Sequence, residues 1–124
     1  MATKVIMPVE EYLHTSWPDG DREFVHGEVI EKPMPPKSHA KIQKALLLLF
    51  SRWEASRGLC ALPELRCAVA PGVYRLPDVA VFHGEPEEEI PSAPAYAAIE
   101  ILSPDDRMAR SEEHTSELQS RQSI

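Results

Sequence analysis

The sequence has few cysteines and no long apolar run. Its 124 residues include two cysteines, Cys60 and Cys67, which do not form a CxxC pair, so neither a disulfide scaffold nor a zinc knuckle is indicated. No stretch reaches the roughly 18 apolar residues of a membrane-spanning helix, and the N-terminus lacks a hydrophobic signal core. We therefore expect a cytoplasmic protein without a membrane-spanning part.

Basic residues are also in deficit. The chain has 13 Lys and Arg residues against 20 Asp and Glu residues, which gives a formal net charge of −7. This balance argues against a protein that binds nucleic acid through bulk charge alone, so any such role needs a local basic face. The remaining composition, 43% hydrophobic and 27% charged, is typical of one soluble globular domain.

The final segment, residues 110–124, differs in character from the rest. It is a polar run without prolines and without a helical or strand period. Its stretch RSEEHTSELQS matches, residue for residue, the in-frame translation of a common short-read sequencing adapter. We therefore expect a C-terminally truncated domain over residues 1–109 and a non-native, disordered tail over 110–124. A natural polar tail is the alternative.

The first third of the chain predicts a short helix and a hairpin. The helix covers residues 7–13, with a proline in its first turn and acids near its positive end. Two alternating runs, 22–25 and 28–32, flank His26-Gly27, which is typical of a tight β-hairpin.

A long helix over residues 39–57 is the predicted organiser of the core. Ser38 is the expected N-cap, and Gly58 is the expected end. The apolar face of the helix is expected to consist of Ile42, Ala45, Leu46, Leu49, Phe50 and Trp53. Strand-like runs follow at 59–62, 65–70, 77–82 and 96–102. This order predicts an α+β fold with one mixed sheet flanked by helices.

Two acids interrupt strands that otherwise have buried character. Asp78 opens the run PDVAVF, and Glu100 lies inside AAIEIL. A buried ionised carboxylate needs a cation, a metal or a raised pKa, because unpaired burial is costly. Two such acids on neighbouring strands could share one Mg²⁺, which is compatible with phosphodiester hydrolysis. The alternative is that Asp78 caps a strand and Glu100 points to solvent at a sheet edge.

Five segments in order carry a family resemblance. They are MPVEEYL, REFVHGEVIEKP, SHAKIQKALLLLF, PDVAVF and AIEILSP, within the span Val5 to Arg107. Together they resemble the Uma-two family of restriction-endonuclease-like proteins in the PD-(D/E)XK nuclease superfamily. The resemblance implies a mixed sheet flanked by helices, metal-binding acids on adjacent central strands, Mg²⁺ or Mn²⁺ as the cofactor and DNA as the substrate. A homodimer is compatible with it.

The resemblance also implies roles for individual residues. Asp78 and Glu100 would be catalytic acids and metal ligands, and Glu28 would be a third catalytic acid that completes the metal shell. His39 matches the family's histidine at the start of the long helix, where it could touch a phosphate or hydrogen-bond an acid. Without the resemblance, Glu28 is an ordinary hairpin acid and His39 is an ordinary structural histidine.

A local basic stripe accompanies His39. Lys37, Lys41 and Lys44 have the spacing of one helix face, so with His39 they form a candidate nucleic-acid-binding surface. The alternative is a solvated helix face with no ligand.

The chain departs from the superfamily pattern at Leu102. This residue stands two positions after Glu100, where the superfamily has its catalytic lysine, and leucine cannot stabilise charge that develops on a phosphate. In the family a lysine often follows on the next helix, which would begin near residues 105–107. We therefore expect an endonuclease fold that lacks this lysine and cleaves poorly or not at all. The alternative hypotheses are a noncatalytic nucleic-acid- or protein-binding module and a structural remnant.

Overall fold

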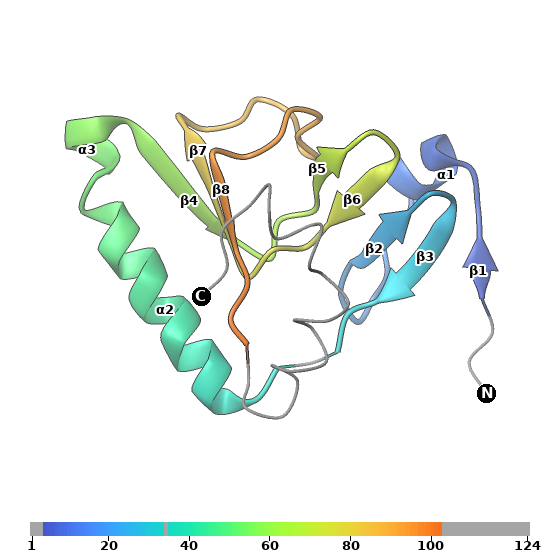
Figure 1. The fold of residues 1–124 in the computed structure, drawn as a ribbon, viewed down its shortest axis with the longest axis horizontal. Coiled ribbons are helices and arrows are strands. Elements are labelled where there is room, and N and C mark those ends of the chain that lie inside the picture. Colours follow the sequence, from blue (N-terminus) through green and yellow to red (C-terminus); the bar gives the residue numbers. More distant parts are fainter. Residues whose placement is uncertain (1–3, 34, 103–124) are drawn as a thin grey trace. The chain divides into compact units, whose positions relative to one another are not determined.

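The computed structural model describes residues 4–33 and 35–102 (Figure 1). The tail over 110–124 and the lysine-bearing helix near 105–107 lie outside the described residues, so both stay predictions. The chain divides into two compact units. The first unit comprises Met1–Met34, Leu65–Leu76 and Pro86–Pro94, and the second comprises Pro35–Glu64, Pro77–Glu85 and Ala95–Ile124.

The first unit contains a five-stranded antiparallel sheet and a short helix. The strands lie in the order β1-β3-β2-β6-β5. The elements are β1 (Val5–Ile6), α1 (Val9–Leu13), β2 (Arg22–Val25), β3 (Glu28–Glu31), β5 (Cys67–Ala70) and β6 (Val73–Arg75). The short helix near the N-terminus is thereby confirmed.

The predicted hairpin is confirmed as the pair β2 and β3. The turn residues His26 and Gly27 have φ angles of 46° and 94°. A type I′ turn requires positive φ angles at both central residues, and its twist matches the twist of the flanking strands. Glycine accepts such an angle at no steric cost, whereas His26 does not. β1 and β6 were not predicted, because runs of two and three residues are too short to show an alternating pattern.

Tyr12 of α1 is at the centre of the first unit's core. Its ring stacks on Phe24 at 4.6 Å and lies 5.6 Å from the ring of Tyr74. The buried Arg66 guanidinium lies 4.9 Å from the centre of the Tyr12 ring and donates a hydrogen bond to the Tyr12 carbonyl. Aromatic packing and a paired cation therefore hold α1 on this sheet.

The second unit contains a three-stranded antiparallel sheet in the order β4-β7-β8 and two helices (Figure 1). Its elements are α2 (Lys37–Ser51), α3 (Glu54–Arg57), β4 (Leu59–Pro63), β7 (Val79–His83) and β8 (Ala97–Ile99). Leu46, Leu47 and Phe50 of α2 pack on a core of buried strand residues, namely Val79, Val81 and Ile99. The helix therefore covers the central strand β7.

The long helix differs from its prediction at both ends. It begins at Lys37 after Pro36, and no side-chain cap bond forms, so the expected cap by Ser38 is wrong. The expected single helix to Arg57 is also wrong, because the amides of Arg52 and Trp53 bond to carbonyls three residues back and the helix restarts at Glu54. The expected end is confirmed, since Gly58 takes the left-handed conformation with φ 64°.

The packed face of α2 also differs from the expected one. Leu46 and Phe50 pack as predicted, but Ile42 and Leu49 are 45% and 39% exposed. Leu47 packs in their place. The α+β class is confirmed, while the strands of the described residues pair in two antiparallel sheets where one mixed sheet was expected.

Candidate active site

Asp78 and Glu100 lie side by side at one end of the second unit's sheet. Val79 pairs with Ile99 in the antiparallel register of β7 and β8. Asp78 precedes Val79 at the start of β7, and Glu100 follows Ile99 at the end of β8. Because the strands are antiparallel, the start of β7 lies beside the end of β8, and the two acids are neighbours. Both residues are buried, at 1% and 6% exposed. Their burial excludes the alternative in which Glu100 points to solvent.

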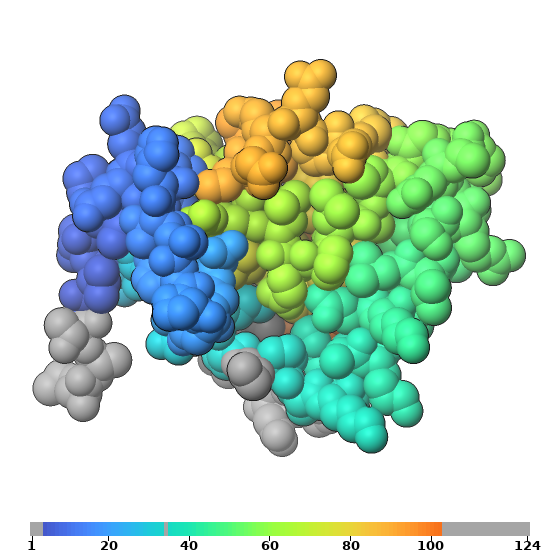
Figure 2. Space-filling model, turned by 180° about the vertical axis from the view of Figure 1, so that it is seen from behind, coloured from blue at the N-terminus to red at the C-terminus, as the bar shows by residue number. Residues whose placement is uncertain are grey.

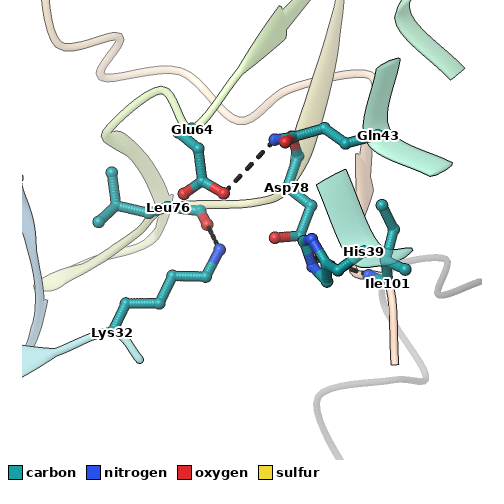
Figure 3. Close-up of polar contacts among 7 residues, drawn as sticks. All are labelled: Lys32, His39, Gln43, Glu64, Leu76, Asp78 and Ile101. Carbon is teal, nitrogen blue, oxygen red and sulfur yellow. Dashed lines mark hydrogen bonds and ion pairs between the residues drawn. The ribbon is translucent and has the colours of Figure 1, made fainter. Parts of the chain in front are cut away.

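The carboxylate of Asp78 is held by two donors. Its Oδ2 accepts a hydrogen bond from the backbone N–H of Ile101 at 2.6 Å and lies 3.0 Å from Nε2 of His39 (Figure 3). Asp78 is in a bend one residue before β7, outside the regular alternation of the strand. Hydrogen bonds to the charged form of a carboxylate offset part of the cost of burying it.

The side chain of Gln43 binds the main chain of Asp78. Its side-chain amide donates to the Asp78 carbonyl at 2.7 Å and to Oε1 of Glu64 at 3.4 Å (Figure 3). Glu64 follows Pro63, which pairs with Val79. The antiparallel register of β4 and β7 therefore places Glu64 beside Asp78, in one row across the end of the sheet. The row at this end of the sheet therefore contains Glu64, Asp78 and Glu100.

A metal ion at this site would be bound mainly by Asp78 and Glu100. Among residues 4–33 and 35–102, no cluster of three or more His, Cys, Asp or Glu side chains is arranged to hold a metal. Mg²⁺ in proteins commonly binds one or two carboxylates and takes its other ligands from water and substrate phosphates. Two buried carboxylates side by side fit that requirement.

Glu28 and Lys32 belong to the first unit. Glu28 begins β3 and lies 4.0 Å from the ammonium of Lys4, an exposed ion pair. Its role as a third catalytic acid stays a prediction. Lys32 follows β3 and donates a hydrogen bond to the carbonyl of Leu76 (Figure 3).

The basic stripe lies on α2 of the second unit. Lys37, Lys41 and Lys44 are exposed on this helix, whose outer side chains form part of the continuous teal and green surface in Figure 2. His39 differs from them because its side chain is only 10% exposed and faces Asp78. Of the two contacts considered for His39, the structure shows the one to an acid, while binding of nucleic acid by the stripe stays a prediction.

Gln43 and Glu64 are site residues that the sequence did not reveal. Gln43 stands one helical turn after His39, so the i, i+4 spacing places both on one helix face. A neutral glutamine in an amphipathic helix does not by itself indicate a functional site. Glu64 becomes adjacent to Asp78 only through the register of β4 and β7. Such pairing is not encoded by any local pattern.

The sequence of this chain matches a family model described as "Uma2: Putative restriction endonuclease" over residues 9–121. The chain belongs to this family. Among solved structures it is similar to "a putative nuclease belonging to DUF820 from Anabaena variabilis ATCC 29413". The two share 25% sequence identity with a TM-score of 0.72, over 94% of this chain and 70% of that chain. No curated protein matches with significance. The resemblance and the nuclease-like fold expected from the sequence are thereby confirmed.

Two further observations apply to this Uma2 chain. Leu102, two positions after Glu100, is half-buried, so an apolar side chain occupies the position where the superfamily pattern has lysine. In the part of the chain that the structure describes, no helix is both long enough and apolar enough to cross a membrane.

Proposed function

We propose that this Uma2 chain is a metal-dependent endonuclease that hydrolyses phosphodiester bonds of DNA, with Mg²⁺ or Mn²⁺ held by Asp78 and Glu100, and that its cleavage is weak because Leu102 stands where the superfamily pattern has lysine. The observation that carries the proposal is the pair of buried carboxylates at one end of the sheet, just before β7 and just after β8. Membership of a family described as a restriction endonuclease supports it. The solved nuclease of similar fold adds support.

The chain's own residues have separable tasks in this proposal. The carboxylates of Asp78 and Glu100 provide negative charge and hard oxygen donors in a buried place, where electrostatic interactions are stronger than in water. The Ile101 amide fixes one oxygen of Asp78. A bound divalent cation would stabilise charge on the phosphate and lower the pKa of a bound water.

A second candidate function is a noncatalytic nucleic-acid- or protein-binding module with the same fold. The observation that favours it is Leu102, which can neither orient a water nor stabilise charge on a phosphate. For DNA as its ligand, this module predicts metal-independent affinity that falls as salt rises.

The proposal is tested by Mn²⁺ calorimetry and plasmid nicking with the complete chain. The exchanges Asp78→Asn and Glu100→Gln keep shape but remove charge, so each should abolish Mn²⁺ binding and the weak nicking by the unsubstituted chain. The matched controls are Asp19→Asn and Glu31→Gln, two exposed acids of the first unit, and they should behave as the unsubstituted chain.

Two results would count against the endonuclease. Nicking that survives both Asp78→Asn and Glu100→Gln removes these acids from the chemistry. Salt-sensitive DNA binding without any Mn²⁺ binding favours the noncatalytic module instead.

A further inference from the structure

We propose that His39 and Gln43 are positioning residues that fix Asp78 for metal binding; this inference rests on the proposed function. The two residues are one turn apart on α2, so their side chains leave the same face of the helix. His39 contacts the carboxylate of Asp78, and Gln43 binds its main-chain carbonyl. One helix thus fixes both the side chain and the backbone of a single buried acid.

The geometry leaves Asp78 little freedom. Its side chain is 2% exposed, and its Oδ2 is held from α2 by His39 and from the segment after β8 by the Ile101 amide. Gln43 fixes the backbone carbonyl of Asp78, which lies in the bend just before β7. A ligand fixed in advance loses less entropy when a cation binds, so these contacts act on metal affinity.

His39 has a feature that a purely structural residue does not need. Its Nδ1 is buried and has no hydrogen-bond partner among the described residues, while its Nε2 faces Asp78. A buried ring nitrogen without a partner costs free energy, and an apolar ring of similar shape would avoid that cost. The contact with Asp78 is therefore the feature of the imidazole that an apolar ring cannot replace.

Gln43 acts in a similar way from the next turn. Its amide donates to Asp78 and also to Glu64, so it fixes the spacing between the start of β7 and the end of β4. Hydrogen-bond partners of metal-binding carboxylates typically change metal affinity or activity by about 10–100-fold when they are removed. We expect losses in that range at both positions.

The test compares shape-preserving exchanges in the complete chain. His39→Phe and Gln43→Met remove the donors, whereas His39→Gln keeps a nitrogen donor near the position of Nε2. Ser51→Ala is the control, because Ser51 lies on the same helix and its hydroxyl donates within that helix, to the Leu48 carbonyl. The measurements are the Mn²⁺ dissociation constant by calorimetry, the Mn²⁺ dependence of plasmid nicking, and thermal unfolding in EDTA.

His39→Phe and Gln43→Met should each raise the Mn²⁺ dissociation constant by about 10–100-fold. The Mn²⁺ concentration for half-maximal nicking should rise in parallel, while the rate at saturating Mn²⁺ changes less. His39→Gln should retain most of the affinity, and Ser51→Ala should retain all of it. If the role were merely structural, His39→Phe and Gln43→Met would have a lower unfolding temperature in EDTA, and His39→Gln would not restore the Mn²⁺ affinity.

The failures of the two proposals are distinguishable. If the unsubstituted chain binds Mn²⁺ and folded His39→Phe and Gln43→Met bind it equally well, the positioning role is overturned while the metal site stands. If His39→Phe does not fold, Gln43→Met and His39→Gln decide the outcome. Equal loss in His39→Gln and His39→Phe overturns the positioning role of His39. An unsubstituted chain that binds no Mn²⁺ overturns both proposals.

Discussion

Tyr12 illustrates how single buried polar groups are satisfied in this chain. Its hydroxyl donates a hydrogen bond to the Arg22 carbonyl at 2.6 Å, and the adjacent Arg66 donates to the carbonyls of Tyr12 and Thr15. Burial raises the pKa of the Tyr12 hydroxyl far above its ordinary value of 10.0, and the Arg66 charge lowers it only in part. The hydroxyl therefore stays protonated and donating across the neutral range.

We predict that Tyr12→Phe lowers the free energy of unfolding by about 1 kcal/mol, because the Arg22 carbonyl loses its donor. The effect should depend on pH. Above pH 10 the unfolded tyrosine ionises while folded Tyr12 keeps its proton, so the stability contributed by Tyr12 falls as the pH rises further. Urea unfolding at several pH values measures both effects.

The matched control for this prediction is Tyr96→Phe, because Tyr96 is 67% exposed. It should change neither the stability at neutral pH nor its alkaline decline. Equal slopes above pH 10 in Tyr12→Phe and the unsubstituted chain would contradict the assignment of that decline to Tyr12.

At the scale of elements, α2 shows that periodicity identifies a helix without identifying its packed face. Leucines from position 46 to 49 offer more than one apolar stripe. The structure packs Leu46 and Leu47 on the sheet and leaves Leu48 60% exposed. Contacts with β7 and β8 determine which apolar stripe of α2 is packed, so the packed face cannot be inferred from the sequence of the helix alone.

We predict different costs for two adjacent leucines of α2. Leu47→Ala removes a half-buried side chain from the core of the second unit and should lower the free energy of unfolding by about 1–2 kcal/mol, less than a fully buried leucine would. Leu48→Ala should change it by less than about 0.5 kcal/mol. Both exchanges keep helix propensity high, so denaturant unfolding isolates the packing term. Equal costs would contradict the observed packed face.

At the scale of the whole molecule, the net charge of −7 opposes contact with DNA, while three lysines form a local basic surface on α2. Binding that depends on a few phosphate contacts is weak at physiological salt and strongly salt-dependent. Low salt is therefore the condition in which to look for it.

We predict that the combined exchange of Lys37, Lys41 and Lys44 to Gln weakens DNA binding at low salt and reduces the slope of log affinity against log salt. Loss of all three phosphate contacts would reduce the slope by about 2.7, since each contact contributes about 0.9. Fluorescence anisotropy with a labelled duplex over a salt series measures it. Lys4→Gln, an exposed lysine of the first unit, is the control, and an unchanged slope in the triple variant would identify the stripe as a solvated face.

The sequence alone determined what local physics can determine. The turn at His26-Gly27 follows from its backbone requirements, the helix end at Gly58 follows from its left-handed angle, and the acids at 78 and 100 stood out because they interrupt apolar runs. The five ordered motifs also indicate the family, which the match to the family model confirms. The turn, the helix end and the two acids are each recognised from a few neighbouring residues, whereas the family is recognised from the order of the motifs along the chain.

Only the tertiary structure decided which distant residues meet. The register of β7 and β8 places Glu100 beside Asp78, and the packing of α2 turns His39 and Gln43 toward Asp78. The expected cap at Ser38 failed because the helix already begins at Lys37, directly after Pro36. Strand register and the packed side of a helix are set by burial and hydrogen bonds between segments far apart in the chain, and a local pattern does not contain them.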